Sequence, residues 1–93
     1  MKYYGECAAS GVVSGEVTTS VGGRGILLLD FLNPNFILSQ EKIKGLILRR
    51  GGLLCHGAVL AREYNIPCLV NTKISKISGR VELNATEGYV KTI

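Results

Sequence analysis

The feature that most constrains the fold of this chain is a pattern of strand, glycine turn, helix and strand near its middle. Residues 45–48, GLIL, form an apolar run of strand length, and Gly51-Gly52 follow as a turn. Residues 57–64, GAVLAREY, favour a helix, and Asn65 can end it in the left-handed conformation. Residues 67–71, PCLVN, then predict a second strand. A unit of this kind predicts two parallel strands with a right-handed crossover.

Other segments extend the expected sheet. Residues 26–30 form an apolar run that is typical of a strand buried on both faces. The partly alternating residues 11–19 predict a strand in which Gly15 marks a bulge or a close backbone approach. Two more strands are expected near the end of the chain, at residues 80–84 and 89–92 around Gly88.

Two segments between the strands are less regular. Asn33-Pro34 resembles an N-cap followed by proline at the first helical position, which predicts a short helix over residues 34–40. Residues 72–78, TKISKIS, fit a helix and a strand equally well. Together these patterns place the chain in the α/β class.

The size and composition of the chain predict one folded domain, residues 1–93. Hydrophobic residues make up 46% of the 93 and charged residues 19%, which suits a compact globule and not a disordered chain. The longest apolar runs are far shorter than the roughly 20 residues that cross a bilayer, and the first residues do not form a signal peptide. We therefore expect no membrane partner and a cytoplasmic location. A large substrate would need a second protein.

The charge pattern argues against nucleic-acid binding, and the cysteine pattern argues against a metal site. The net charge is +4, but the basic residues are scattered and no aromatic residues alternate with them, so we expect no nucleic-acid partner. Three cysteines, Cys7, Cys55 and Cys68, are an odd number without metal-ligand spacing. Free thiols and no metal site are the expectation.

His56 is the only histidine in the chain, and it opens the expected helix after the glycine turn. A helix start has unpaired backbone N–H groups and the positive end of the helix dipole. This setting disfavours the imidazolium form and leaves a neutral nitrogen able to attack an electrophilic phosphorus. The first-turn amides can then bind the phosphate oxygens. The sequence makes His56 the candidate catalytic residue.

The residues after His56 suit a helix that packs closely. Three small residues let it approach the sheet or a partner: Gly57, Ala58 and Ala61. The buried stripe of the helix is expected to consist of larger apolar residues: Val59, Leu60 and Tyr64. Cys55 offers a weak S–H donor and Arg62 a permanent positive charge. Arg62 lies about 240° round the helix from His56, so the spacing leaves its contact with a phosphoryl group open.

Each of these residues also has a plain structural interpretation. A lone histidine beside a turn is more often a surface or hydrogen-bonded residue than a nucleophile. Cys68 is expected to be a small buried hydrophobic residue. Arg49-Arg50 fit solvated residues at a strand end, and Arg62-Glu63 fit the polar face of a helix.

Residues 51–70, GGLLCHGAVLAREYNIPCLV, resemble the phosphohistidine motif of the mobile, or swivelling, domain of phosphoenolpyruvate-utilising enzymes. In that family a Gly-Gly turn leads to Ser-His or Cys-His, a small residue, alanine, two apolar residues and Ala-Arg, often followed by Glu-x-Gly-Ile-Pro. The resemblance extends to residues 8–17, 25–30 and 80–90, and so covers nearly the whole chain.

The resemblance implies a fold and a site. The fold would be the swivelling β/β/α domain, in three layers, with a small parallel sheet, a second, mostly antiparallel sheet and short helices. His56 would carry the phosphoryl group. The residues implied to support it are Gly51, Gly52, Cys55, Gly57, Ala58 and Arg62.

The resemblance also implies partners. The module would stand alone as one component of a phosphotransferase of the phosphoenolpyruvate synthase or pyruvate phosphate dikinase kind. A separately encoded protein would bind the nucleotide, phosphoenolpyruvate or pyruvate. Mg²⁺ and the nucleotide or phosphoenolpyruvate would be held by that partner, and this chain would bind no cofactor directly.

The chain departs from the family pattern at four places, and two of them, Leu54 and Leu32, favour a second hypothesis. Leu54 stands where many relatives have threonine, and Leu32 lies near another common threonine position. Asn65 replaces a helix-ending glycine, which the geometry tolerates, and Asn84-Ala85 replace a common Asp-Gly. A chain with less polar support around its histidine fits a non-catalytic interaction or regulatory module that retains the swivelling-domain fold.

Overall fold

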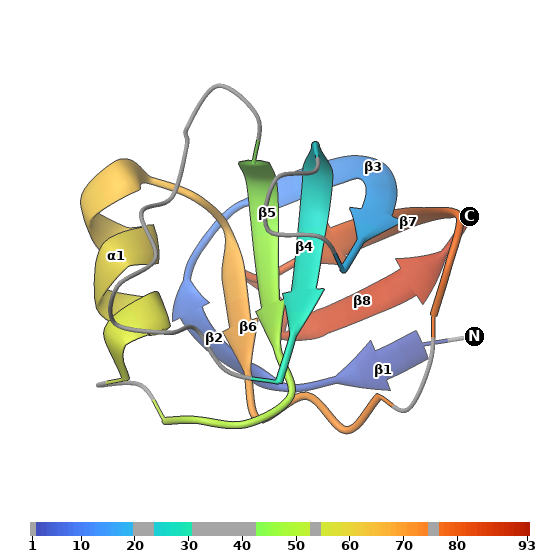
Figure 1. Ribbon diagram of the computed structural model, residues 1–93. Helices are drawn as coiled ribbons and strands as arrows, with labels where there is room; N and C mark the ends of the chain where they lie inside the picture. Colours follow the sequence, from blue (N-terminus) through green and yellow to red (C-terminus); the bar gives the residue numbers. More distant parts are fainter. Residues whose placement is uncertain (1, 20–23, 31–42, 53–54, 75–76) are drawn as a thin grey trace.

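The computed structural model describes residues 2–19, 24–30, 43–52, 55–74 and 77–93. Within these residues the chain forms eight strands and one helix (Figure 1). In chain order they are β1 Lys2–Tyr4, β2 Glu6–Ala9, β3 Val12–Thr18, β4 Gly25–Leu29, β5 Ile43–Leu48, α1 His56–Tyr64, β6 Cys68–Val70, β7 Arg80–Asn84 and β8 Tyr89–Thr92.

The strands follow one continuous order, β1-β8-β7-β3-β4-β5-β6-β2, that forms two layers. In the first layer β1, β8, β7 and the first part of β3 pair antiparallel. In the second layer the end of β3 pairs in parallel with β4, β4 with β5 and β5 with β6, while β2 adds an antiparallel edge. The helix α1 covers the outer face of this second layer (Figure 1). The expected three-layered β/β/α fold, with a small parallel sheet and a mostly antiparallel one, is confirmed.

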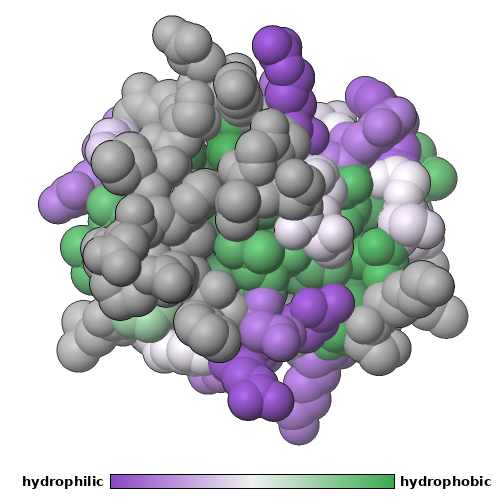
Figure 2. All heavy atoms as spheres, viewed as in Figure 1, coloured by the Kyte–Doolittle hydropathy of each residue, from purple (hydrophilic) through white to green (hydrophobic). Residues whose placement is uncertain are grey.

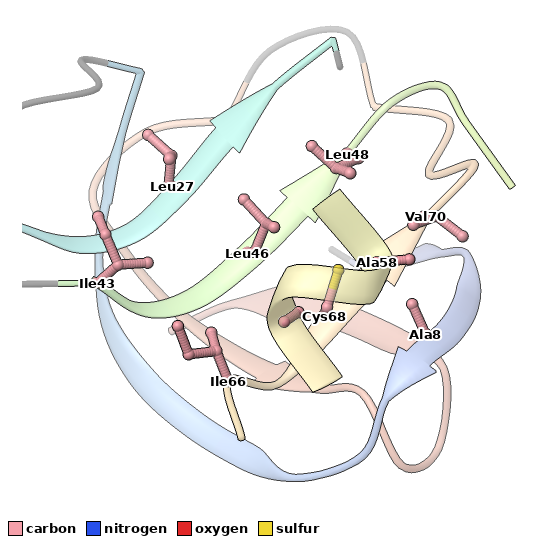
Figure 3. Close-up of a cluster of buried hydrophobic side chains, with 10 residues drawn as sticks. Ala8, Leu27, Ile43, Leu46, Leu48, Ala58, Ile66, Cys68 and Val70 are labelled. Carbon is pink, nitrogen blue, oxygen red and sulfur yellow. The ribbon is translucent and has the colours of Figure 1, made fainter. Parts of the chain in front are cut away.

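The side chains of the parallel strands alternate between two cores, because successive residues of a strand point to opposite faces. One core lies between the parallel layer and α1, and Figure 3 shows its members. Its strand residues are Leu27, Ile43, Leu46, Leu48, Cys68 and Val70. The other core lies between the two sheets and takes the intervening residues: Ile26, Leu28, Ile47 and Leu69. Burial on both faces explains why these strands are continuous apolar runs in the sequence.

A glycine in β5 lets the two sheets approach closely. A Cβ at Gly45 would lie 2.8 Å from Leu83 Cδ2 and 3.1 Å from Val13 Cγ1, both in the antiparallel layer. The expectation of a bulge or close approach at Gly15 is wrong. The β3–β7 register is unbroken there, and the nearest atom to a Cβ at Gly15 is 3.9 Å away. Register shifts lie elsewhere, between Gly25 and Ile26 in the β4–β5 pair and between Cys7 and Ala9 in the β2–β6 pair.

Most of the predicted elements are confirmed with small changes in their bounds. The strands expected at residues 11–19, 26–30, 45–48 and 67–71 correspond to β3, β4, β5 and β6, and those at 80–84 and 89–92 to β7 and β8. The two strands that flank α1, β5 and β6, are parallel, as the strand–helix–strand pattern predicted. The helix expected at residues 34–40 lies outside the described residues. The described part of 72–78 forms neither helix nor strand.

The strands β1 and β2 have no recognisable pattern in the sequence. They contain three and four residues, too few to show a periodic pattern. Their partners are β8 and β6, which lie more than fifty residues away in the chain. Only the folded sheet therefore defines these two strands.

Candidate functional site

The turn from β5 into α1 depends on Gly51. Its φ is +110°, which residues with a side chain rarely adopt, and a Cβ there would lie 3.0 Å from Cys55 Sγ. The Cys55 N–H donates to the Gly52 carbonyl at 3.1 Å. The turn therefore joins Gly51, Gly52 and Cys55 next to the carboxyl ends of the parallel strands, where open α/β sheets bind ligands.

The helix α1 begins at His56, with Cys55 as an extended N-cap residue. The Cys55 carbonyl accepts the first helical hydrogen bond, from the Val59 N–H at 3.1 Å. The Cys55 side chain makes no capping hydrogen bond, and the first turn of α1 holds no acidic residue. Among the described residues, the first amides of α1 therefore have neither a capping side chain from Cys55 nor a nearby carboxylate. This leaves them suited to binding an external anion.

The buried face of α1 is made of small residues. Gly57 is buried, and Ala58 and Ala61 are completely inaccessible to solvent. The expectation that Val59 lies in the buried stripe is wrong, because Val59 is 39% exposed. Two larger residues are partly buried against the helix-side core: Leu60 and Tyr64. Small residues dominate this face because α1 lies directly on β2 and β6, which leaves little room for longer side chains.

Arg62 connects α1 to the edge of the parallel layer. Its Nε donates a hydrogen bond of 2.8 Å to the carbonyl oxygen of Ala8 in β2. Arg62 is exposed, as the polar-face interpretation predicted, but its hydrogen bond to Ala8 gives it a structural contact as well. This contact fixes the last turn of α1 against a strand that lies 54 residues earlier in the chain.

The three cysteines are free thiols, as expected, and they differ in burial. Cys7 is exposed, Cys55 is half-buried and Cys68 is buried beneath α1. Burial raises the pKa of Cys68 from 9.0 to about 12, and the nearby thiol of Cys55 adds to this increase. Cys68 is a buried hydrophobic residue, as predicted.

Arg49 makes a set of contacts that the sequence did not indicate. Its Nε donates to the Ile74 carbonyl at 2.7 Å, and its Nη1 lies 3.1 Å from Asp30 Oδ1. The interpretation of Arg49 as a solvated residue at a strand end is wrong, whereas the next residue, Arg50, is exposed. One sequence signal could have suggested the pair: Asp30 and Arg49 have opposite charges, and each directly follows one of two consecutive parallel strands. Figure 2 shows hydrophilic side chains gathered at this edge, below the ends of β4 and β5.

Thr72, just after β6, is a buried polar residue. It is 0% exposed, and its hydroxyl oxygen has no hydrogen-bond partner in the described part of the chain. Its N–H donates to the Leu48 carbonyl at 3.1 Å, so the segment after β6 continues beside the end of β5. Nothing in the sequence singles out Thr72, because one threonine in TKISKIS has no distinctive pattern.

The four departures from the family pattern have different outcomes. Leu32 and Leu54 lie outside the described residues. Asn65 adopts the left-handed conformation with φ 55° and ψ 42°, as predicted. Asn84 belongs to the β7–β8 hairpin, where its Oδ1 accepts a hydrogen bond from the Glu87 N–H and its Nδ2 donates to the Tyr89 hydroxyl.

Two further properties concern only the described residues. They contain no group of three or more His, Cys, Asp or Glu side chains placed to hold a metal ion. Their one helix is too short to cross a membrane.

Comparisons with known proteins agree with this geometry. The family model for "PEP-utilising enzyme, mobile domain" matches residues 21–88. The rifampicin phosphotransferase of Bacillus cereus is 40% identical over 72 residues, which cover 73% of this chain and 8% of that protein. The phosphoenolpyruvate synthase of Neisseria meningitidis serogroup B is 30% identical over 73 residues, covering 74% of this chain and 9% of that protein.

Among solved structures, the holo-form of Thermococcus kodakaraensis aconitase X has a TM-score of 0.68 at 16% identity. The match covers 98% of this chain and 97% of that chain, so the same fold includes the first twenty residues that the family model leaves out. At this identity the similarity shows the fold alone.

The fold and the helix start at the carboxyl edge define a layered β/β/α domain. The family model covers well over half of the residues, and the chain therefore belongs to the mobile-domain family of phosphoenolpyruvate-utilising enzymes. It spans about a tenth or less of the length of the curated relatives it matches.

Proposed function

We propose that this chain is a phosphoryl-carrier domain and that His56 is the residue transiently phosphorylated. The observation that carries the proposal is the position of His56 as the first residue of α1, directly after the turn at Gly51, in a chain of this family. The side chain of the N-cap residue Cys55 makes no capping hydrogen bond, so the first amides of α1 suit phosphate oxygens. Gly57 and Ala58 contribute amides and little side-chain bulk.

The proposed chemistry is nucleophilic displacement at phosphorus. A neutral imidazole nitrogen of His56 donates its electron pair to the phosphorus of the donor, while the bond from phosphorus to the leaving oxygen breaks and that oxygen keeps the electron pair. The other ring nitrogen retains its proton. In the second step an acceptor oxygen attacks the same phosphorus and the nitrogen–phosphorus bond breaks. Cys55 and Arg62 would support the site from the N-cap and from the contact with β2.

The donor and the acceptor are assigned to a partner protein or domain. Because the chain spans 8% and 9% of two matched relatives, most of their length is available for other sites. We assign the nucleotide, phosphoenolpyruvate or pyruvate, with Mg²⁺, to that partner, as the family resemblance implies. The names of the relatives make rifampicin an acceptor to test beside pyruvate.

The test is transfer of radioactive phosphate to the purified chain. The chain is mixed with candidate partner proteins and labelled ATP or phosphoenolpyruvate, and the modified protein is examined for acid-labile label, as phosphohistidine gives. We expect label on the wild type and none on His56→Ala, with circular dichroism showing that the variant is folded. Because His56 is the only histidine, a phosphorylated imidazole is also a single assignable NMR signal.

Two results would overturn the proposal. One is label that persists on His56→Ala. The other is a partner that binds the wild type and His56→Ala equally well while neither becomes labelled with any donor. The second result would assign the chain to the class of non-catalytic interaction modules.

A further inference from the structure

One arginine side chain connects the carboxyl ends of three neighbouring segments of the parallel layer. Arg49, at the end of β5, donates from Nε to the Ile74 carbonyl, in the segment after β6, at 2.7 Å. Its Nη1 pairs at 3.1 Å with Asp30, just after β4. The side chain of Arg49 is only 27% exposed, and its bond to Ile74 is partly buried, whereas its pair with Asp30 is exposed. Hydrogen bonds from a charged donor in such a setting are stronger than those between neutral groups.

Backbone hydrogen bonds next to Arg49 join the same three segments. The Arg49 N–H donates to the Leu29 carbonyl at 2.9 Å, and the Arg50 N–H donates to the Asp30 carbonyl at 2.8 Å. On the other side, the Thr72 N–H donates to the Leu48 carbonyl at 3.1 Å. The end of β5 is therefore held between its two neighbours up to the residue before Gly51.

The glycine turn that follows has few contacts of its own. Gly51 and Gly52 are exposed, and no described atom lies within 4 Å of the Cβ position at Gly52. Among the described residues of the turn, the Cys55 N–H donates to the Gly52 carbonyl, a bond that lies within the turn itself. The position of the turn is thus set by its two ends, which are α1 on one side and the Arg49–Arg50 strand end on the other.

From these contacts we infer that Arg49 is a positioning residue for the His56 site. By holding the ends of β4 and β5 and the segment after β6 together, it fixes the point from which the turn leads into α1. It acts through the backbone and touches neither the phosphoryl donor nor the acceptor. The inference rests on the proposed phosphorylation of His56. Loss of Arg49 should then slow phosphoryl transfer without weakening the partner's binding.

The experiment compares Arg49→Met with Arg80→Met, which removes an exposed arginine from β7 in the other layer. Initial rates of His56 labelling are measured against partner concentration. We expect Arg49→Met to lower the maximal rate about 10- to 100-fold, the range produced by small misplacements of reacting groups, with the half-saturating partner concentration unchanged. Arg49→Lys keeps the charge but has all its donors on one nitrogen, whereas Arg49 uses Nε for Ile74 and Nη1 for Asp30, so it should restore the rate only in part. Arg80→Met should behave as the wild type.

Two further measurements keep the outcome decisive. Asp30→Asn is the second variant, to be used even if Arg49→Met does not fold. It removes only the ion pair, at a residue that is 57% exposed, and should lower the rate less than Arg49→Met does. Amide NMR of Gly51, Gly52 and Cys55 should show shifted signals and faster exchange in Arg49→Met, with the amides of β7 and β8 unchanged. Wild-type rates in both Arg49→Met and Asp30→Asn, or unchanged turn amides in Arg49→Met, would overturn the inference. Failure of the wild type to take up label would instead overturn the proposed function, and the amide signals would still decide the role of Arg49.

Discussion

Thr72 packs directly against Gly5, the residue that separates β1 from β2. A Cβ built on Gly5 would lie 2.5 Å from Thr72 Oγ1 and 2.9 Å from the Val70 carbonyl oxygen. The chain passes here from one layer to the other, because β1 pairs with β8 and β2 pairs with β6. The Gly5 N–H also donates to the Gly88 carbonyl at 3.1 Å. The junction of the two layers therefore has no room for a side chain at Gly5.

Gly5→Ala is expected to lower the free energy of unfolding by about 1–3 kcal/mol, as overpacking of a closely packed position does. The added methyl group would meet backbone as well as the Thr72 side chain, so the strain cannot be relieved by one rotamer change. Urea unfolding measures the loss. The matched control is Gly52→Ala, where the added methyl group meets open space and the cost should stay below about 1 kcal/mol. Equal free energies of unfolding for the two variants would contradict the prediction that Gly5 has no room for a side chain.

Thr72→Val is expected to leave the free energy of unfolding unchanged or to raise it by up to about 2 kcal/mol. The two side chains have nearly the same shape, and the change removes a buried hydroxyl that has no partner among the described residues. Thr72→Ser keeps the hydroxyl and loses a buried methyl group, so it should destabilise by about 1 kcal/mol. A large loss of stability in Thr72→Val, measured by urea unfolding, would mean that the hydroxyl is hydrogen-bonded.

Stability is expected to fall in alkaline solution through Cys68. Its pKa is raised from 9.0 to about 12 by burial, so the folded state retains a proton that the unfolded state releases. The stability this provides is fully present below pH 9 and is lost as the pH rises toward 12. Urea unfolding at pH 8 and pH 10 under reducing conditions should show a smaller pH-dependent loss in Cys68→Val than in the wild type. An equal loss in both proteins would exclude Cys68 as the cause.

Arg62→Met is expected to lower the free energy of unfolding by about 1–2 kcal/mol, because it removes the hydrogen bond from Arg62 Nε to the Ala8 carbonyl. Hydrogen exchange should accelerate for the amides in the last turn of α1, since this contact holds α1 on β2. Arg80→Met, which also removes an exposed arginine, is the control and should change stability by less than about 0.5 kcal/mol. No difference between the two variants would show that the contact contributes nothing in solution.

The predictions from sequence succeeded where neighbouring residues carry the signal. The apolar runs at residues 26–30 and 45–48 predict strands correctly, because burial on both faces leaves an uninterrupted apolar run. The end of α1 was recognised at Asn65 because few residues other than glycine and asparagine adopt φ 55° easily. The prediction for Val59 failed because hydrophobicity alone does not reveal how closely a helix approaches its sheet.

The sequence by itself determined the strand–turn–helix–strand unit from β5 to β6 and the position of His56 at the start of α1, because each step depends on residues a few positions apart. Tertiary structure alone decided the existence of β1 and β2, the contacts of Arg49 with Asp30 and Ile74, and the bond from Arg62 to Ala8. The physical reason is that these features join segments 19 to 54 residues apart or depend on strands too short to have a pattern. Their partners become neighbours only when the sheets assemble.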